Sequence, residues 1–306
     1  MSETTAKISD AVLANQTAFR WKTIDGIKIF YREAGSPNSP TLVLLHGFPT
    51  SSHMYRDLIP QLASEFHLIA PDYPGFGYSD QPPVDRFEYT FDSLAELMDR
   101  FLDAIEVTNF SIYIQDYGAP IGFRLFTANP KRIQSIISQN GNAYDEGLGP
   151  FWDDIMKPYW ANKNPETEKK MLVTVALETT KYQYTEGYRR PELISPDTYT
   201  LDQMGLDRPG NAAIQLALAY DYQNNVKLYP TWHETLRRHQ PPVLAVWGKN
   251  DPFFIPPGAE AFKKDVPGAQ VRLIDSGHFA LEDRYVEIAE HIKEFRRANP
   301  TQIAGA

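Results

Sequence analysis

The stretch SIYIQDYGAPIGFRL, residues 111–125, decides the fold of this chain. It begins as an apolar, β-branched run that is typical of a strand, breaks at Asp116, and resumes with a pattern that predicts a helix. A strand that turns abruptly into a helix, with one reactive side chain at the turn, is a nucleophile elbow. The residue two positions after the apex of such a turn must be small, and Gly118 meets that requirement.

The apex carries an aspartate where a serine is more usual. An unperturbed aspartate is already ionised at pH 7, so Asp116 needs no general base to act as a nucleophile. A purely structural alternative is that Asp116 caps the N-terminus of the helix that follows. The stretch taken alone leaves both interpretations open.

Strands and helices alternate on both sides of the elbow. Asp25 and Gly26 join two strand-like runs, which predicts a β-hairpin. Further strands are expected at 41–45, 67–70, 133–138, 243–248 and 271–274, and helices at 51–64, 90–104 and 286–296. This alternation predicts a mostly parallel, doubly wound α/β sheet.

The alternation of strand and helix patterns stops between residues 141 and 239. No continuous apolar strand occurs there, and helical stretches rich in tyrosine and tryptophan are separated by prolines. We therefore predict an α/β core in two parts, 1–140 and 240–306, and a helical cap of 141–239 inserted after the sixth strand.

Two more loops carry candidate catalytic side chains. Asp251 follows the strand expected at 243–248, and His278 follows the strand expected at 271–274. Loops after the carboxyl ends of parallel strands line the binding crevice, and the order Asp116, Asp251, His278 is the order of nucleophile, acid and base expected after an elbow. Taken singly, Asp251 could be a turn residue before a proline and His278 a capping or core histidine.

Composition excludes several classes of protein. The net charge of −9, without a basic cluster, argues against partners such as nucleic acid or an anionic membrane surface. The absence of cysteine excludes disulfides and thiol chemistry. Residues 1–17 lack the apolar segment of a signal peptide, and no stretch approaches the length of a membrane span, so we expect a cytoplasmic protein.

From about residue 21 to residue 297, the chain resembles the epoxide hydrolase and haloalkane dehalogenase group of α/β-hydrolases. The resemblance rests on HGFP at 46–49, PDYPGFGYSD at 71–80, QDYG at 115–118, Asp251 and the pair Gly277-His278. It implies the α/β-hydrolase fold with an eight-stranded sheet, a small hydrophobic electrophilic substrate, and no cofactor or metal. The oligomeric state and the natural substrate stay open.

The resemblance also implies a mechanism. Asp116 would attack an sp³ carbon and form an alkyl-enzyme ester, and His278, oriented by Asp251, would then activate a water that hydrolyses it. The backbone N–H groups of Phe48 and Tyr117 would form the oxyanion hole. His46 is expected to shape its loop rather than to titrate.

The residues that would bind the leaving group do not decide between a halide and an epoxide oxygen. Dehalogenases of this group hold the halide with a tryptophan directly after the nucleophile and with a second donor, whereas this chain has Tyr117 and Phe48 at those places. The Tyr117 hydroxyl could reach a halide, and a tryptophan of the predicted cap could supply the second N–H donor; the candidates are Trp152, Trp160 and Trp232.

Epoxide hydrolases of the group instead hydrogen-bond the ring oxygen with cap tyrosines. Tyr222 is the first candidate for that donor, and Tyr159, next to Trp160, is the second. Epoxide hydrolysis is therefore slightly favoured and haloalkane dehalogenation is the alternative. A third possibility, from a different class, is a small-molecule receptor or a cofactor-free oxygenase on the same scaffold.

Overall fold

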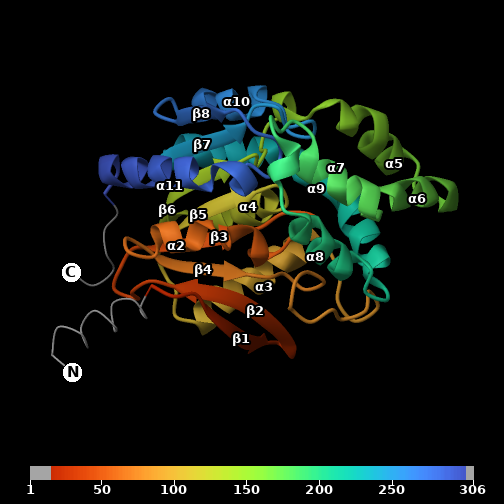
Figure 1. The fold of residues 1–306 in the computed structure, drawn as a ribbon, viewed down its shortest axis with the longest axis horizontal. Coiled ribbons are helices and arrows are strands. Elements are labelled where there is room, and N and C mark those ends of the chain that lie inside the picture. Colours follow the sequence, from red (N-terminus) through yellow and green to blue (C-terminus); the bar gives the residue numbers. More distant parts are fainter. Residues whose placement is uncertain (1–14, 301–306) are drawn as a thin grey trace.

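The computed structural model describes residues 15–300, which form an eight-stranded sheet in the order β1-β2-β4-β3-β5-β6-β7-β8 (Figure 1). The β1–β2 and β2–β4 pairs are antiparallel and the other pairs are parallel. The strands are β1 (Ala18–Ile24), β2 (Ile27–Ala34), β3 (Thr41–Leu45), β4 (His67–Pro71), β5 (Phe110–Gln115), β6 (Ile133–Gln139), β7 (Val243–Gly248) and β8 (Gln270–Ile274). The predicted mostly parallel α/β fold is confirmed.

Helices flank the sheet and fill the connection between β6 and β7. The flanking helices are α2 (Leu58–Leu62), α3 (Phe91–Ala104), α4 (Gly118–Ala128), α10 (Pro257–Asp265) and α11 (Leu281–Ala298). The connection holds α5 (Lys157–Ala161), α6 (Pro165–Met171), α7 (Leu177–Thr185), α8 (Pro196–Leu206) and α9 (Asn211–His239). Short 3₁₀ or π segments are η1 (Ser52–Tyr55), η2 (Pro130–Arg132), η3 (Asp145–Gly147), η4 (Trp152–Met156), η5 (Leu172–Val175) and η6 (Pro191–Leu193).

Strand β3 is buried on both of its faces, which explains why its sequence is continuously apolar. Successive side chains of a strand point to opposite faces of the sheet. Leu42 and Leu44 pack into the cluster that also contains residues of α2 and α11, whereas Val43 and Leu45 pack into the cluster of α3 and α4. All four side chains are fully buried, because helices cover both faces of the sheet.

The hairpin forms as the sequence predicts. Asp25 and Gly26 both have positive φ, +50° and +81°, as a two-residue type I′ turn requires. Strand β1 thereby pairs with β2 from the register Ile24–Ile27 outward and adds an antiparallel edge to the parallel sheet.

Three helical segments differ from expectation. The helix expected at 51–64 is broken into η1 and α2, because Pro60 lacks an N–H and its ring clashes with the carbonyl of Arg56 in a continuous helix. Helix α10 was not expected, since the prolines before it suggest a loop; Pro257 instead occupies its first turn, where proline is tolerated. Helix α11 begins at Leu281, before the predicted residue 286.

The chain between Gln139 and Val243 is named the helical insertion below. Figure 1 shows its helices α5 to α8 at one end of the sheet. Between those two residues the described chain contributes no strand to the sheet, so a helical segment follows the sixth strand, as predicted. The boundaries at 141 and 239 stay a prediction, and most of the predicted N-terminal tail lies outside the described residues.

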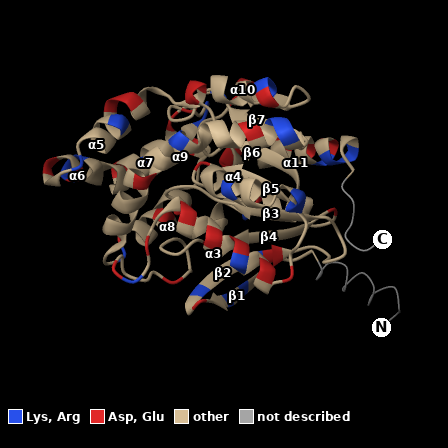
Figure 2. Ribbon diagram, turned by 180° about the vertical axis from the view of Figure 1, so that it is seen from behind, with Lys and Arg blue, Asp and Glu red and all other residues tan. Residues whose placement is uncertain are grey.

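The surface charges are mixed. Figure 2 shows lysines and arginines interspersed with acidic residues over the helices and strands on that side. Among residues 15–300, none of the helices combines the length and the apolar character needed to cross a bilayer.

Candidate active site

The elbow between β5 and α4 places Asp116 at a strained apex. Asp116 has φ +48°, in the left-handed region that non-glycine residues rarely adopt. A Cβ on Gly118 would lie 2.0 Å from the carbonyl oxygen of Leu45, so only glycine lets α4 begin this close to β3. The sequence therefore turns sharply and leaves one carboxylate at the N-terminus of α4.

Backbone donors surround the Asp116 carboxylate. The N–H of Phe48 donates a 2.7 Å hydrogen bond to Oδ1, and the N–H of Tyr117 also interacts with the carboxylate. Burial raises the pKa of Asp116 to about 6, against the lowering effects of His278 and the two N–H groups. Asp116 is therefore mostly ionised at neutral pH, and the two predicted oxyanion donors both lie at its carboxylate.

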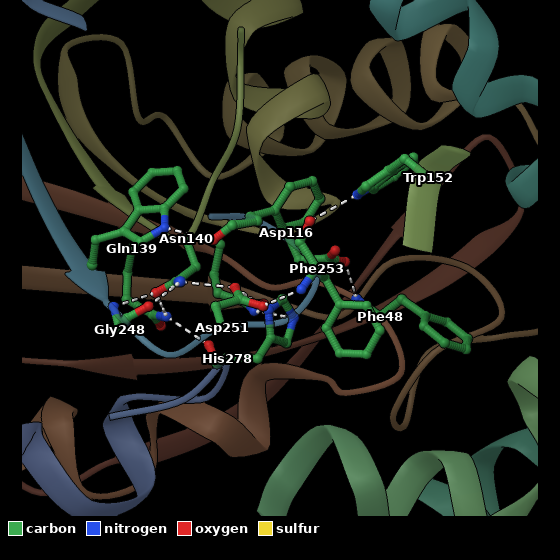
Figure 3. A network of polar contacts seen from close by, with 12 residues as sticks. Phe48, Asp116, Gln139, Asn140, Trp152, Gly248, Asp251, Phe253 and His278 are labelled. Atoms are coloured by element: carbon green, nitrogen blue, oxygen red, sulfur yellow. Dashed lines mark hydrogen bonds and ion pairs between the residues drawn. The ribbon is translucent and has the colours of Figure 1, made fainter. Parts of the chain in front are cut away.

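His278 and Asp251 form a buried hydrogen-bonded pair (Figure 3). Nδ1–H of His278 donates to Oδ2 of Asp251 over 2.8 Å. Asp251 also accepts from the Asn140 amide at 2.8 Å and from the N–H of Phe253 at 2.7 Å. Burial alone would lower the pKa of His278, but the charge and hydrogen bond of Asp251, with the charge of Asp116, raise it overall.

Two polar residues at the end of β6 support this pair, and the sequence analysis missed them. Asn140, at φ +50°, also accepts from the N–H of Gly248 at 2.9 Å. The side chain of Gln139 donates to the carbonyl of His278 at 2.8 Å. The sequence offers a signal for them, because Gln139 and Asn140 stand at the carboxyl end of β6, which lies between β5 and β7 in the sheet.

His46 has a structural role in its loop. Its Nδ1–H donates to the carbonyl of Gly47 at 2.9 Å, and its Nε2 accepts from the N–H of Tyr73 at 3.3 Å. Burial lowers the pKa of His46 to about 3, so the ring is neutral at physiological pH. This agrees with the expectation that His46 shapes the loop.

Asp116 and His278 face one cavity of about 60 Å³ between the sheet and the helical insertion. Its walls are mostly apolar, with the Tyr117 side chain and the amides of Gln183 and Gln215 among them. The other lining residues are Phe48, Phe151, Trp152, Met156, Met171, Thr174, Thr179, Ala219, Phe253 and Phe254. The two glutamines were not predicted, since a single polar residue on an insertion helix carries no distinguishing sequence signal.

Three candidates from the predicted cap, Tyr159, Trp160 and Tyr222, are not among the lining residues. The Tyr159 hydroxyl donates to the carbonyl of Leu216 at 3.4 Å, and the Trp160 indole donates to the carbonyl of Ala219 at 2.8 Å. Tyr222 lies one layer behind the wall.

The Tyr222 ring packs directly against two residues of the cavity wall. Its centroid is 4.5 Å from that of Trp152 and 5.9 Å from that of Tyr117. Its buried hydroxyl makes no hydrogen bond of good geometry among the described residues, but it interacts with the hydroxyl of Tyr229. Tyr222 is therefore close to the cavity but does not line it.

The remaining tryptophans of the donor hypothesis have other contacts. The Trp152 indole N–H donates to the carbonyl of Phe253 at 2.9 Å (Figure 3). Trp232 stacks on Phe123 of α4 at 5.1 Å. Within residues 15–300, no group of three or more metal-ligating side chains is arranged to hold an ion.

A carboxylate at an elbow, an Asp–His pair on the loops after β7 and β8, and N–H donors at the carboxylate are the arrangement expected of a hydrolase site on an α/β sheet. The family model described as "alpha/beta hydrolase fold" matches residues 40–285. The chain belongs to this family.

Individual proteins similar to this chain are hydrolases of named or unnamed activity. An uncharacterized hydrolase of Saccharomyces cerevisiae is 47% identical over 88% of this chain and 93% of its own length. A haloalkane dehalogenase of Psychrobacter cryohalolentis is 28% identical over 90% of this chain and 89% of its own. The solved structure of the epoxide hydrolase CorEH superposes with a TM-score of 0.74 at 20% identity, covering 92% of this chain and 99% of that one. The predicted membership of the α/β-hydrolase family is confirmed, the similarity extends to haloalkane dehalogenases in sequence and to an epoxide hydrolase in fold, and the chain is an α/β-fold hydrolase.

Proposed function

We propose that this hydrolase cleaves a small electrophile at an sp³ carbon through an aspartyl ester on Asp116. The observation that carries the proposal is the pairing of a carboxylate at the elbow apex with a buried Asp251–His278 pair, both facing one cavity. A serine hydrolase needs its histidine to activate the nucleophile, whereas an ionised Asp116 attacks directly and leaves His278 for the second step.

In the first step, an Asp116 oxygen bonds to the substrate carbon as the leaving atom departs from the opposite side. The apolar cavity favours a neutral substrate, and the leaving atom acquires negative charge there. In the second step, a water loses a proton to Nε2 of His278 and attacks the ester carbonyl. The developing oxyanion would receive the N–H groups of Phe48 and Tyr117 that now interact with the carboxylate.

Opening of an epoxide is the reaction that the donors around the cavity favour. An epoxide leaves as an alkoxide, which needs a strong hydrogen-bond donor. The Tyr117 side chain lines the cavity, and burial with the nearby Asp116 charge holds the pKa of its hydroxyl well above the usual range. It stays protonated as a donor. Tyr222, the first candidate from sequence, is the second donor candidate behind it.

Haloalkane dehalogenation is the second candidate. It is supported by the curated relatives named haloalkane dehalogenases and by the Gln183 amide in the cavity wall, whose N–H groups suit a halide. The Gln215 amide also lines the wall, but its nitrogen donates to Asn211 at 3.1 Å. Against it, the indole N–H groups of Trp152 and Trp160 both donate to backbone carbonyls. A pair of tryptophan donors for a halide would require these bonds to break.

The size of the cavity limits the substrate. An apolar protein cavity of about 150 Å³ holds benzene. The cavity here is about 60 Å³, so a three-carbon epoxide is a better match than styrene oxide unless the walls move.

The deciding assay offers propylene oxide and 1,2-dibromoethane to the same preparation and measures diol and bromide. Diol formation that disappears in Asp116→Ala supports the proposal, and bromide without diol supports the second candidate. If neither product forms while the protein binds such molecules, a non-hydrolytic role replaces both.

A matched pair of variants identifies the donor. Tyr117→Phe should slow epoxide opening by about 10²–10⁴-fold, the worth of one general acid, and should slow bromide release far less. Tyr222→Phe serves as the comparison, since it removes a hydroxyl from the next layer. If only Tyr222→Phe lowers epoxide opening, the sequence-based assignment holds and the role of Tyr117 is wrong.

A further inference from the structure

Gln115, the last residue of β5, places a fully buried amide between the nucleophile and the base. Its Nε2 lies 3.0 Å from Nε2 of His278. An amide nitrogen only donates, so this contact uses the single lone pair of the neutral imidazole. The Gln115 amide oxygen is buried and has no hydrogen-bond partner among the described residues.

That unpartnered oxygen lies beside the nucleophile. A Cβ built on Gly47 would be 2.4 Å from Oε1 of Gln115 and 2.6 Å from Oδ1 of Asp116. Both oxygens therefore pack closely against the backbone of Gly47 in the loop after β3. Any side chain at position 47 would collide with them, so glycine is required there.

Hydrolysis of the Asp116 ester needs a water in this region. The water must donate one hydrogen bond to Nε2 of His278, and in doing so it displaces the Gln115 N–H from the lone pair. Its second hydrogen then needs an acceptor, because leaving a polar group unpaired in a buried site is unfavourable. Oε1 of Gln115 is buried, lacks a donor among the described residues, and belongs to the amide that already contacts Nε2 of His278.

We propose that Gln115 is the positioning residue for the hydrolytic water: its Oε1 accepts the second O–H of the water whose first O–H points to His278. This rests on the ester mechanism proposed above. With both hydrogens held, a lone pair of the water points at the ester carbonyl carbon of Asp116.

In ester hydrolysis, the water oxygen bonds to the Asp116 carbonyl carbon and one water proton passes to Nε2 of His278. The bond between that carbon and the bridging oxygen, which came from the Asp116 carboxylate, then breaks, and the departing alkoxide takes the proton back from His278. The second water proton stays on the new Asp116 carboxyl group and is released to solvent as Asp116 returns as a carboxylate; Gln115 is unchanged.

The test separates the two chemical steps of Gln115→Met, which keeps the length of the side chain and removes the amide. We expect alkylation of Asp116 within about threefold of the parent and ester decay slowed by about 10²-fold, the cost of a misplaced reactant. Rapid-quench mass spectrometry of the adduct measures both. Ser111→Ala, on the same strand, is the control, since it removes a buried hydroxyl that contacts Ser135 and no residue of the site.

Gln115→Asn covers the case in which the methionine variant does not fold, because it keeps an amide but withdraws it by one methylene; ester decay should again slow more than alkylation. Ester decay at the parent rate, or equal slowing of both steps with a lowered melting temperature, would overturn the positioning role. His278→Gln run in parallel distinguishes the two proposals. If it traps the ester while Gln115→Met does not, only the Gln115 proposal fails; if no variant forms an ester, the mechanism itself fails.

Discussion

At the scale of single residues, the two titrating groups of the site act on each other. The charge of Asp116 is one of the causes that raise the pKa of His278. Alkylation would convert Asp116 into a neutral ester and remove that charge. The pKa of His278 would then fall, so the histidine would become a freer base at the moment when the proposed mechanism needs one.

His278→Gln should separate the two steps. The variant keeps a polar side chain but cannot take a proton from water, so Asp116 should still be alkylated and the ester should persist. Intact-protein mass spectrometry should show a stable adduct in His278→Gln and none in Asp116→Ala. Turnover of His278→Gln near the parent rate would remove His278 from the role of base.

Both steps should lose rate in acid, for different reasons. Alkylation requires ionised Asp116 and should fall as the pH drops below about 6, where burial places its pKa. Ester decay requires neutral His278, whose pKa is raised in the free enzyme, and should also fall toward low pH. Pre-steady-state rates from about pH 5 to about pH 8 would measure each limb. A flat alkylation limb across that range would contradict the assignment of Asp116 as an ionised nucleophile.

At the scale of elements, α7 and α8 of the helical insertion share a buried carboxyl. Asp202 of α8 accepts a hydrogen bond from the hydroxyl of Tyr184 in α7. Burial is the main cause that raises the pKa of Asp202 to about 7, and Glu282 adds to it while Tyr184 and Arg56 oppose it. A raised carboxyl pKa means that the folded chain holds a proton that the unfolded chain releases, so stability is lost as the pH rises from about 4 toward 7.

Asp202→Asn should therefore stabilise the protein at alkaline pH. Asparagine keeps an oxygen that accepts from Tyr184 and carries no charge to bury, so the gain at about pH 8 should be at least about 1 kcal/mol and should shrink by about pH 5. Thermal melts at the two pH values measure it. Asp85→Asn, in an exposed loop, is the control. An equal shift in melting temperature for both variants would mean that burial of the Asp202 carboxyl does not destabilise the protein at alkaline pH.

At the scale of the whole molecule, local patterns predicted the sheet but not the walls of the site. The run at 41–45 and the hairpin at Asp25-Gly26 were predictable because buried strands and type I′ turns have strict sequence requirements. Asp116, Asp251 and His278 follow strands, and strand ends meet at one edge of the sheet. The contacts of Tyr222, Gln183 and Gln115 depend on how distant segments pack, which no local pattern encodes.

Met171 offers a test of the substrate size. It is buried in α6 and lines the cavity, so Met171→Ala should enlarge the space at a cost of about 2–5 kcal/mol in stability. We expect kcat/KM for styrene oxide, relative to propylene oxide, to rise by about tenfold or more. Met204→Ala, on an exposed position of α8, is the control. An unchanged ratio would mean that the cavity wall does not limit the substrate.

The division of the chain between sheet and insertion has a consequence for how such a protein diversifies. The nucleophile and its partners stand on loops of the sheet, whereas Met156, Met171, Gln183 and Gln215 reach the cavity from the insertion. Replacing insertion helices could then redirect the enzyme to new molecules while the reaction stays the same. The substrate would then change in evolution through replacement of one continuous segment of about a hundred codons, a length at which chains commonly form a separate domain.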